Sequence, residues 1–235
     1  MSEHIWSSYD DELNEVRSIV IQMGDRAVKQ LVGSMEALRE LDHARAVLVS
    51  RSDKELDALE LTAERAVIGV FARRAPVADD LREVVAALKM TTMIERIGDY
   101  AKNIAKRTNP IAEGELVVMP QLLEDMAKAA QQMVERVMDA YLNRDADEAL
   151  AVWESDEVLD DIYTRVYRRI LERMAERPDH INVLTHYLMI AKNLERIGDQ
   201  ATNVAEQIYY AITGDNLEEA RSKGDETSVE LFQQQ

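Results

Sequence analysis

The chain contains one eleven-residue pattern twice, a hundred positions apart. The first copy is E-R-I-G-D-Y-A-K-N-I-A at residues 95–105, and the second is E-R-I-G-D-Q-A-T-N-V-A at residues 195–205. An internal repeat constrains the fold strongly, because each copy must form the same unit and the units must pack on one another. Charged and amide side chains repeat here together with the apolar ones. The repeat therefore points to a function as well as to a fold.

The similarity extends well beyond these two strings. A shift of 103 places Met23, Leu56 and Asp57 on Met126, Leu159 and Asp160, and the shift falls to 102 at the prolines and to 100 at the repeated pattern. We predict two homologous halves, residues 1–112 and 113–213, each of ordinary domain size. A polar tail, residues 214–235, follows them and is expected to be loosely ordered.

Composition and periodicity predict that both halves are helical. Leu, Ala, Glu, Arg and Met dominate, aromatic residues make up 5%, and apolar residues recur at spacings of three and four. Asp42 and Asp145 are placed as N-caps of the second helix of each half. The four prolines are expected at helix boundaries, where a missing N–H costs least. They are Pro76, Pro110, Pro120 and Pro178.

The predicted fold class is all-α, with two tandem repeats that are each an antiparallel three-helix bundle of long helices. The six helices are expected at 8–40, 43–74, 78–108, 120–143, 146–176 and 179–213. Gly98 and Gly198 lie inside the third helix of each half. A glycine there costs about 1 kcal/mol relative to alanine, so its repetition predicts a close approach between helices.

Several classes of function are disfavoured. A net charge of −17 argues against binding to nucleic acid or to an anionic lipid surface. The longest apolar run, residues 66–72, is far shorter than the roughly eighteen residues of a membrane span, and no secretory leader opens the chain. The absence of cysteine excludes thiolate sites and fits a cytoplasmic location. No nucleotide-binding or hydrolase motif is present, so we expect no enzymatic activity.

Acidic pairs at a spacing of four are candidates for metal binding. This composition gives roughly eight such pairs by chance, so one pair alone indicates a solvated helix surface. Repetition distinguishes four of them, with one pair on the second and one on the third helix of each half. They are Asp53/Asp57, Glu95/Asp99, Asp156/Asp160 and Glu195/Asp199.

Such like-charged neighbours repel one another unless a cation offsets the repulsion. Arg96 and Arg196 are one source of positive charge, and we predict that they pair with acidic residues when metal is absent. A bound metal ion with oxygen ligands is the other. Asn103 and Asn203, one turn further on, are candidates to orient the carboxylates or to contact a partner.

The two halves with this pattern on their third helices resemble the PhoU family over residues 8 to about 212. The most similar segment is 189–199, although Thr92-Met93 stands in the first half where the second has Lys192-Asn193. The resemblance implies a cytoplasmic negative regulator of bacterial phosphate uptake and phosphate-starvation signalling. Such a protein would be an adaptor between the ATPase subunit of the phosphate ABC transporter and a sensor histidine kinase.

The resemblance also implies a homodimer and metal ions, such as Fe, Zn, Mn or Mg, held by the eight repeated carboxylates. One alternative stays open: a carboxylate-bridged metalloprotein of the helical-bundle type, with an enzymatic or metal-storage role. Only one E-x-x-H motif, from Glu40 to His43, is present, whereas a ferritin-type di-iron site needs two. Another alternative is a structural or chaperone-like bundle, whose repeats should preserve only the apolar spacing.

Overall fold

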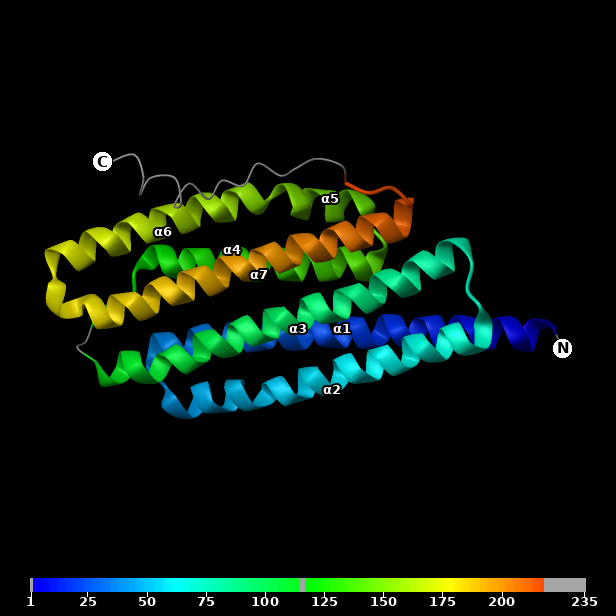
Figure 1. Ribbon diagram of the computed structural model, residues 1–235, viewed down its shortest axis with the longest axis horizontal. Helices are drawn as coiled ribbons and strands as arrows, with labels where there is room; N and C mark the ends of the chain where they lie inside the picture. The colour runs from blue at the N-terminus through cyan, green and yellow to red at the C-terminus, as the bar shows by residue number, and fades with distance from the viewer. Residues whose placement is uncertain (1, 115–116, 218–235) are drawn as a thin grey trace.

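The computed structural model describes residues 2–114 and 117–217, with side chains from residue 9 onward. Over these residues the chain forms helices and no strands, and Figure 1 shows them as two elongated bundles lying side by side. The all-α prediction with two three-helix bundles is confirmed. The first bundle comprises α1 (Ser2–Glu40), α2 (His43–Arg74) and α3 (Ala78–Glu113). The second comprises α4 (Gln121–Asn143), α5 (Ala146–Glu154), α6 (Asp156–Glu176), the 3₁₀ turn η1 (Pro178–His180) and α7 (Ile181–Thr213).

The first turn of each half has the same construction. Leu41 and Arg144, 103 positions apart, both adopt the left-handed conformation, with φ of 52° and 54°. Asp42 then caps α2 by accepting a hydrogen bond from the Arg45 N–H, and Asp145 caps α5 by accepting one from the Glu148 N–H, each at 3.0 Å. Both N-cap predictions are confirmed.

The prediction that Pro110 ends a helix was wrong. Helix α3 continues through Pro110 to Glu113. Proline removes one backbone donor, but this position is in the final turn, where little of the helix remains to be disrupted. The side chain of Ile111 is 3% exposed. We attribute the continuation of the helix to the burial of this residue.

The helix predicted at 146–176 is two helices, α5 and α6, separated at Ser155. The Ser155 hydroxyl donates to the Val152 carbonyl at 2.7 Å, and such a bond competes with the helical ladder. Ser52 makes the equivalent bond to the Val49 carbonyl without interrupting α2, so the serine alone does not cause the break. In the second half, the break places Asp156 in the first turn of α6, where a helix stabilises negative charge.

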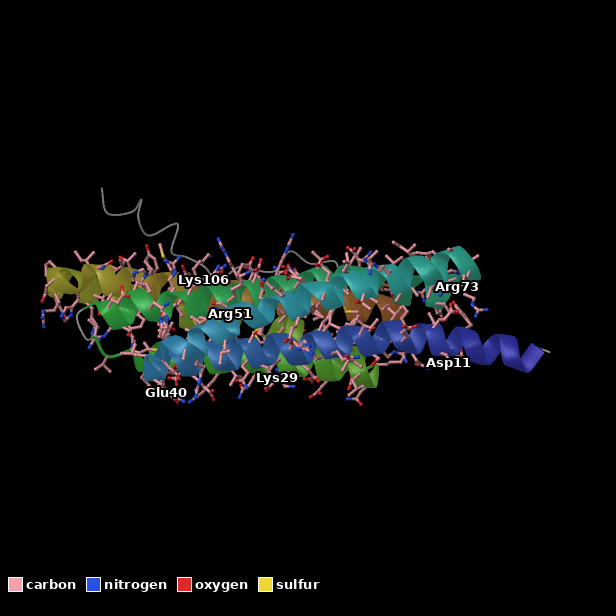
Figure 2. All side chains as sticks on the ribbon, turned by 90° about the horizontal axis from the view of Figure 1, so that it is seen from below. Asp11, Lys29, Glu40, Arg51, Arg73 and Lys106 are labelled. Atoms are coloured by element: carbon pink, nitrogen blue, oxygen red, sulfur yellow. The ribbon has the colours of Figure 1, made fainter. Side chains whose placement is uncertain are left out.

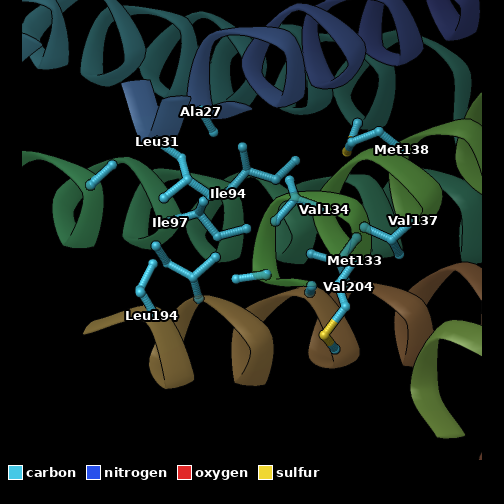
Figure 3. Close-up of a cluster of buried hydrophobic side chains, with 14 of the residues drawn as sticks. Ala27, Leu31, Ile94, Ile97, Met133, Val134, Val137, Met138, Leu194 and Val204 are labelled. Atoms are coloured by element: carbon cyan, nitrogen blue, oxygen red, sulfur yellow. The ribbon is translucent and has the colours of Figure 1, made fainter. Parts of the chain in front are cut away.

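One continuous hydrophobic core joins the two bundles. Figure 3 shows Leu31 of α1, Ile97 of α3, Val134 of α4 and Leu194 of α7 converging in it. The main contact between the halves is made by α3 against α7, with α1 against α4 beside it. Several methionines fill this core. Met23, Met90 and Met126 are fully buried.

Polar contacts reinforce the junction between the halves. The Glu83 carboxylate of α3 accepts from Arg17 of α1 and, at 2.5 Å, from Arg144 at the end of α4. Many other charged side chains lie along the outer surface, where Figure 2 labels Lys29, Arg51 and Lys106. Among the described helices, none combines the length and the apolar character that crossing a membrane requires. The predicted tail lies outside the described residues from 218 onward.

Candidate functional site

The two repeated glycines allow helices of the same bundle to approach closely. A Cβ atom at Gly98 would overlap the Leu56 side chain of α2, and one at Gly198 would overlap the Leu159 side chain of α6. Leu56 and Leu159 occupy equivalent positions and are both buried, so neither can move aside easily. The close approach predicted from the glycines is confirmed. It places the acidic pairs of neighbouring helices beside one another.

In the first half, carboxylates from α2 and α3 converge on one flank of the bundle. Glu95 of α3 lies close enough to the carboxylates of Asp53, Asp57 and Glu60 on α2, and to Asp99 on its own helix, to be affected by their charges. Burial, followed by repulsion from these charges, raises the pKa of Glu95 to about 7. Carboxylates of α2 and α3 therefore lie on the same flank, and their role as a joint site stays a prediction.

Lys102 is the cation of this cluster. Its ammonium donates to Asp53 on α2 and, at 3.0 Å, to Asp99 one turn earlier on α3. These hydrogen bonds, above all the one to Asp53, raise the pKa of Lys102 further above its usual range. Asp53 is 4% exposed. Its second oxygen, Oδ1, is buried and has no hydrogen-bond partner within the described part of the chain.

The carboxylates of the second half are more deeply buried. Asp156, Asp160 and Glu195 are each 6–7% exposed, whereas only Asp53 is buried to this extent in the first half. Here Lys192 supplies positive charge and donates to Glu195 Oε1 at 2.7 Å. Its ammonium also lies 5.1 Å from the centroid of the Tyr163 ring on α6, a favourable cation–π arrangement.

The pairing predicted for Arg96 and Arg196 does not form. Over residues 2–114 and 117–217, no ion pair involves either arginine, and lysines occupy that role in both halves. The Arg196 guanidinium instead lies 5.8 Å from the centroid of the Tyr100 ring. Both arginines are exposed, and Arg196 reaches toward α3 of the other half and not toward its own acidic cluster. Asn103 and Asn203 are half-buried one turn beyond Asp99 and Asp199, and their role stays a prediction.

Four residues of the clusters were missed by sequence reasoning: Lys102, Lys192, Glu60 and Tyr163. A signal for the lysines existed, since Lys102 is three residues after Asp99 and Lys192 is three residues before Glu195. Glu60 and Tyr163 occupy equivalent positions of the repeat, so an acidic residue in one half corresponds to an aromatic residue in the other. As the side chains stand, no three His, Asp or Glu residues among those described are arranged to hold a metal ion.

The fold and the clusters define a class of protein: a duplicated three-helix bundle with a repeated acidic motif between its second and third helices. The PhoU domain family model matches the chain twice, at residues 20–108 and 123–208. The chain belongs to the PhoU family.

Relatives and solved structures agree with this assignment. A protein of Zymomonas mobilis, named as a homologue of the phosphate-specific transport system accessory protein PhoU, is 41% identical over 94% of this chain and 93% of its own length. A homologue of the same name from Caulobacter vibrioides is 40% identical over 96% of this chain and 98% of its own. The crystal structure of PhoU from Pseudomonas aeruginosa superposes with a TM-score of 0.85 at 31% identity, covering 88% of this chain and all of that one.

Proposed function

We propose that this chain is a regulatory accessory protein of a phosphate-specific transport system. The observation that carries the proposal is that both halves match the family model, while relatives named as accessory proteins of that system align over nearly the whole chain. The acidic clusters support a regulatory role, because the carboxylates are repeated in both halves but no catalytic motif accompanies them.

In finer detail, we propose a non-enzymatic adaptor that restrains phosphate uptake and signalling when phosphate is plentiful. Its partners would be the ATPase subunit of the phosphate transporter and a phosphate-sensing histidine kinase. The protein would act from the cytoplasm, as a homodimer. Side chains with nitrogen and with oxygen atoms project along the helices drawn in Figure 2, and such a polar surface suits contacts with protein partners.

We further propose that the acidic clusters bind metal ions, with Fe, Zn, Mn and Mg as candidates. The donors in the first half are Asp53, Asp57, Glu95 and Asp99, and those in the second are Asp156, Asp160, Glu195 and Asp199. Their chemistry fits, since carboxylate oxygens suit hard and borderline cations. Two observations in the first half support this fit: the mutual repulsion at Glu95 and the buried, unbonded Oδ1 of Asp53. When bound, a cation would neutralise charge and stabilise the folded bundle by mass action.

Complementation tests the regulatory proposal. In a bacterium that lacks its own PhoU-family protein, this chain should restore repression of a phosphate-starvation reporter in high phosphate. The double variant Glu95→Gln and Glu195→Gln should repress less, because it removes one carboxylate from each cluster.

Glu15→Gln with Glu157→Gln is the charge-matched control. It removes one exposed glutamate from each half outside the clusters and should repress as the unaltered chain does. If the unaltered chain is expressed and folded but fails to restore repression, the regulatory proposal is wrong. If the cluster variant represses fully and keeps its metal content, the clusters are ordinary helix surface.

A further inference from the structure

The first-half cluster already contains a cation of its own, the ammonium of Lys102. This group contacts one carboxylate on each of two helices, Asp53 on α2 and Asp99 on α3. Lys102 therefore joins α2 to α3 through the pairs Asp53/Asp57 and Glu95/Asp99. A bound metal ion would join the same two helices through the same pairs. The side chain of Asp53 is almost fully buried, so its charge needs a nearby cation.

Lys102 does not satisfy all of Asp53. The Oδ1 atom is buried and has no hydrogen-bond partner among the described residues, although a carboxylate oxygen accepts hydrogen bonds or coordinates a cation readily. A single ammonium at Oδ2 thus leaves part of the acceptor capacity unused. Lys102 contacts only two of the four carboxylates whose charges act on Glu95.

The lysine is not part of the repeat. Thr202 stands at the equivalent position of the second half, is fully buried, and donates to the Asp199 carbonyl at 2.9 Å. The lysine of the second half, Lys192, comes from the opposite side of the motif, where the first half has Thr92. The two halves therefore place a lysine at different positions of the motif: Lys102 contacts Asp53 and Asp99, and Lys192 contacts Glu195, the equivalent of Glu95.

We infer that the Lys102 ammonium competes with metal ions for the carboxylates of the first-half cluster. This inference rests on the proposed metal binding. A metal ion that contacts Asp53 Oδ2 and Asp99 Oδ1 takes the place of the Lys102 ammonium, so binding to these atoms is an exchange of one cation for another. The side chain of Lys102 is 26% exposed, and it therefore has a route into solvent once it is displaced. The competition lowers the metal affinity of the first half, because metal binding must break the contacts that Lys102 makes with Asp53 and Asp99.

The test measures Mn²⁺ binding to the full-length, chelator-treated protein by titration calorimetry, with the paramagnetic resonance of free Mn²⁺ as a second readout. Lys102→Thr introduces the residue found in the second half. Lys102→Met keeps the apolar stem and guards against misfolding of the threonine variant. Lys106→Thr, an exposed lysine one turn further along α3, is the matched control. The unaltered chain and the three lysine variants are also measured in a Glu195→Gln background, because this substitution weakens the second cluster.

Both Lys102 variants should bind Mn²⁺ about 10- to 100-fold more tightly than the unaltered chain, and Lys106→Thr should not differ from it. Without metal, both Lys102 variants should melt at a lower temperature, and Mn²⁺ should raise their melting temperature more than that of the unaltered chain. If the unaltered chain binds Mn²⁺ and the Lys102 variants bind it equally well, the competition is disproved while the metal proposal stands. If no variant binds Mn²⁺, the inference and the proposed Mn²⁺ binding both fail, and complementation still decides the regulatory role separately.

Discussion

The two halves have the same fold and equivalent carboxylates, yet their acidic clusters differ in burial and in charge. In the first half, Glu60 adds a further carboxylate and Asp57 is exposed. In the second half, Tyr163 stands at the position of Glu60, and both Asp156 and Asp160 are buried. The comparison shows that duplication preserved the helix packing and the acidic motif, while single substitutions around it changed the environment of each cluster.

The neutralising cations show the same divergence. Lys102 joins α2 to α3 through two carboxylates, whereas Lys192 bonds to Glu195 and lies over the ring of Tyr163 on α6. A partly exposed cluster with excess negative charge is open to a cation from solvent. A buried cluster held by an ammonium and an aromatic ring depends more on its internal partners. The two halves should therefore respond differently to equivalent substitutions.

The largest expected effect concerns the two glycines. Gly98→Ala should lower the free energy of unfolding by about 2–3 kcal/mol and Gly198→Ala by about 1–2 kcal/mol, because each added methyl group overlaps a buried leucine. The first is expected to cost more because Gln30 Oε1 also lies 2.6 Å from the added atom. Urea unfolding measures both. Gly69→Ala is the control: its methyl group meets only the guanidinium end of Arg73, so it should be neutral or stabilise by up to about 1 kcal/mol. Equal losses at all three positions would contradict the packing argument.

Removing the equivalent glutamates should have opposite effects at pH 8 in metal-free protein. Glu195→Gln should destabilise by about 1–2 kcal/mol, because it weakens a charge-assisted hydrogen bond from Lys192 at a buried site. Glu95→Gln should stabilise by up to about 1 kcal/mol, because it removes a charge that burial and its neighbours disfavour. Thermal unfolding of the two single variants measures the difference. A change of the same sign in both would show that the clusters are energetically equivalent.

The raised pKa of Glu95 predicts a pH dependence that belongs to the first half. Between its ordinary value of 4.5 and about 7, the folded state keeps this proton more readily than the unfolded state does. The stabilisation that protonated Glu95 gives to the folded state is therefore complete below pH 4.5 and is lost as the pH rises through 7. The unaltered metal-free protein should lose about 1 kcal/mol more over this range than Glu95→Gln does, after allowance for the partial exposure of the group. Unfolding at a series of pH values tests this, and parallel curves for the two proteins would contradict it.

The smallest expected effect isolates Glu60, the residue that Tyr163 replaces in the second half. Glu60→Gln keeps the size of the side chain and a carbonyl acceptor for the Thr92 hydroxyl, which lies 3.0 Å from Glu60 Oε1. It should lower the pKa of Glu95 from about 7, because one source of repulsion is gone, while stability changes by less than about 0.5 kcal/mol. The titration of Glu95, followed by NMR, measures the shift. An unchanged pKa would mean that solvent screens Glu60 from Glu95.

Periodicity, capping residues and the repeat register together predicted most of the fold. These signals are local or repeat at a constant shift, so the positions of α2 and α4, the two aspartate caps and the buried glycines follow from the sequence. The exceptions are Pro110, which lies inside α3, and the break at Ser155. At Pro110 the outcome depends on the free energy gained by burying Ile111, and at Ser155 it depends on the position that the break gives to Asp156. An argument from helix propensity includes neither contribution.

The sequence by itself determined which carboxylates belong together, because only the repeat separates four acidic pairs from the many that composition produces. The tertiary structure decided which cation faces them. Arg96 and Arg196 adjoin the motif in sequence, but at 100° per residue a neighbouring side chain points to another face of the helix. Lys102 and Lys192 are three residues away from their carboxylates and share their face. The tertiary structure also decided burial. Asp57 is exposed and Asp160 is buried although their backbone positions are equivalent, because exposure depends on the side chains that other helices place over each position.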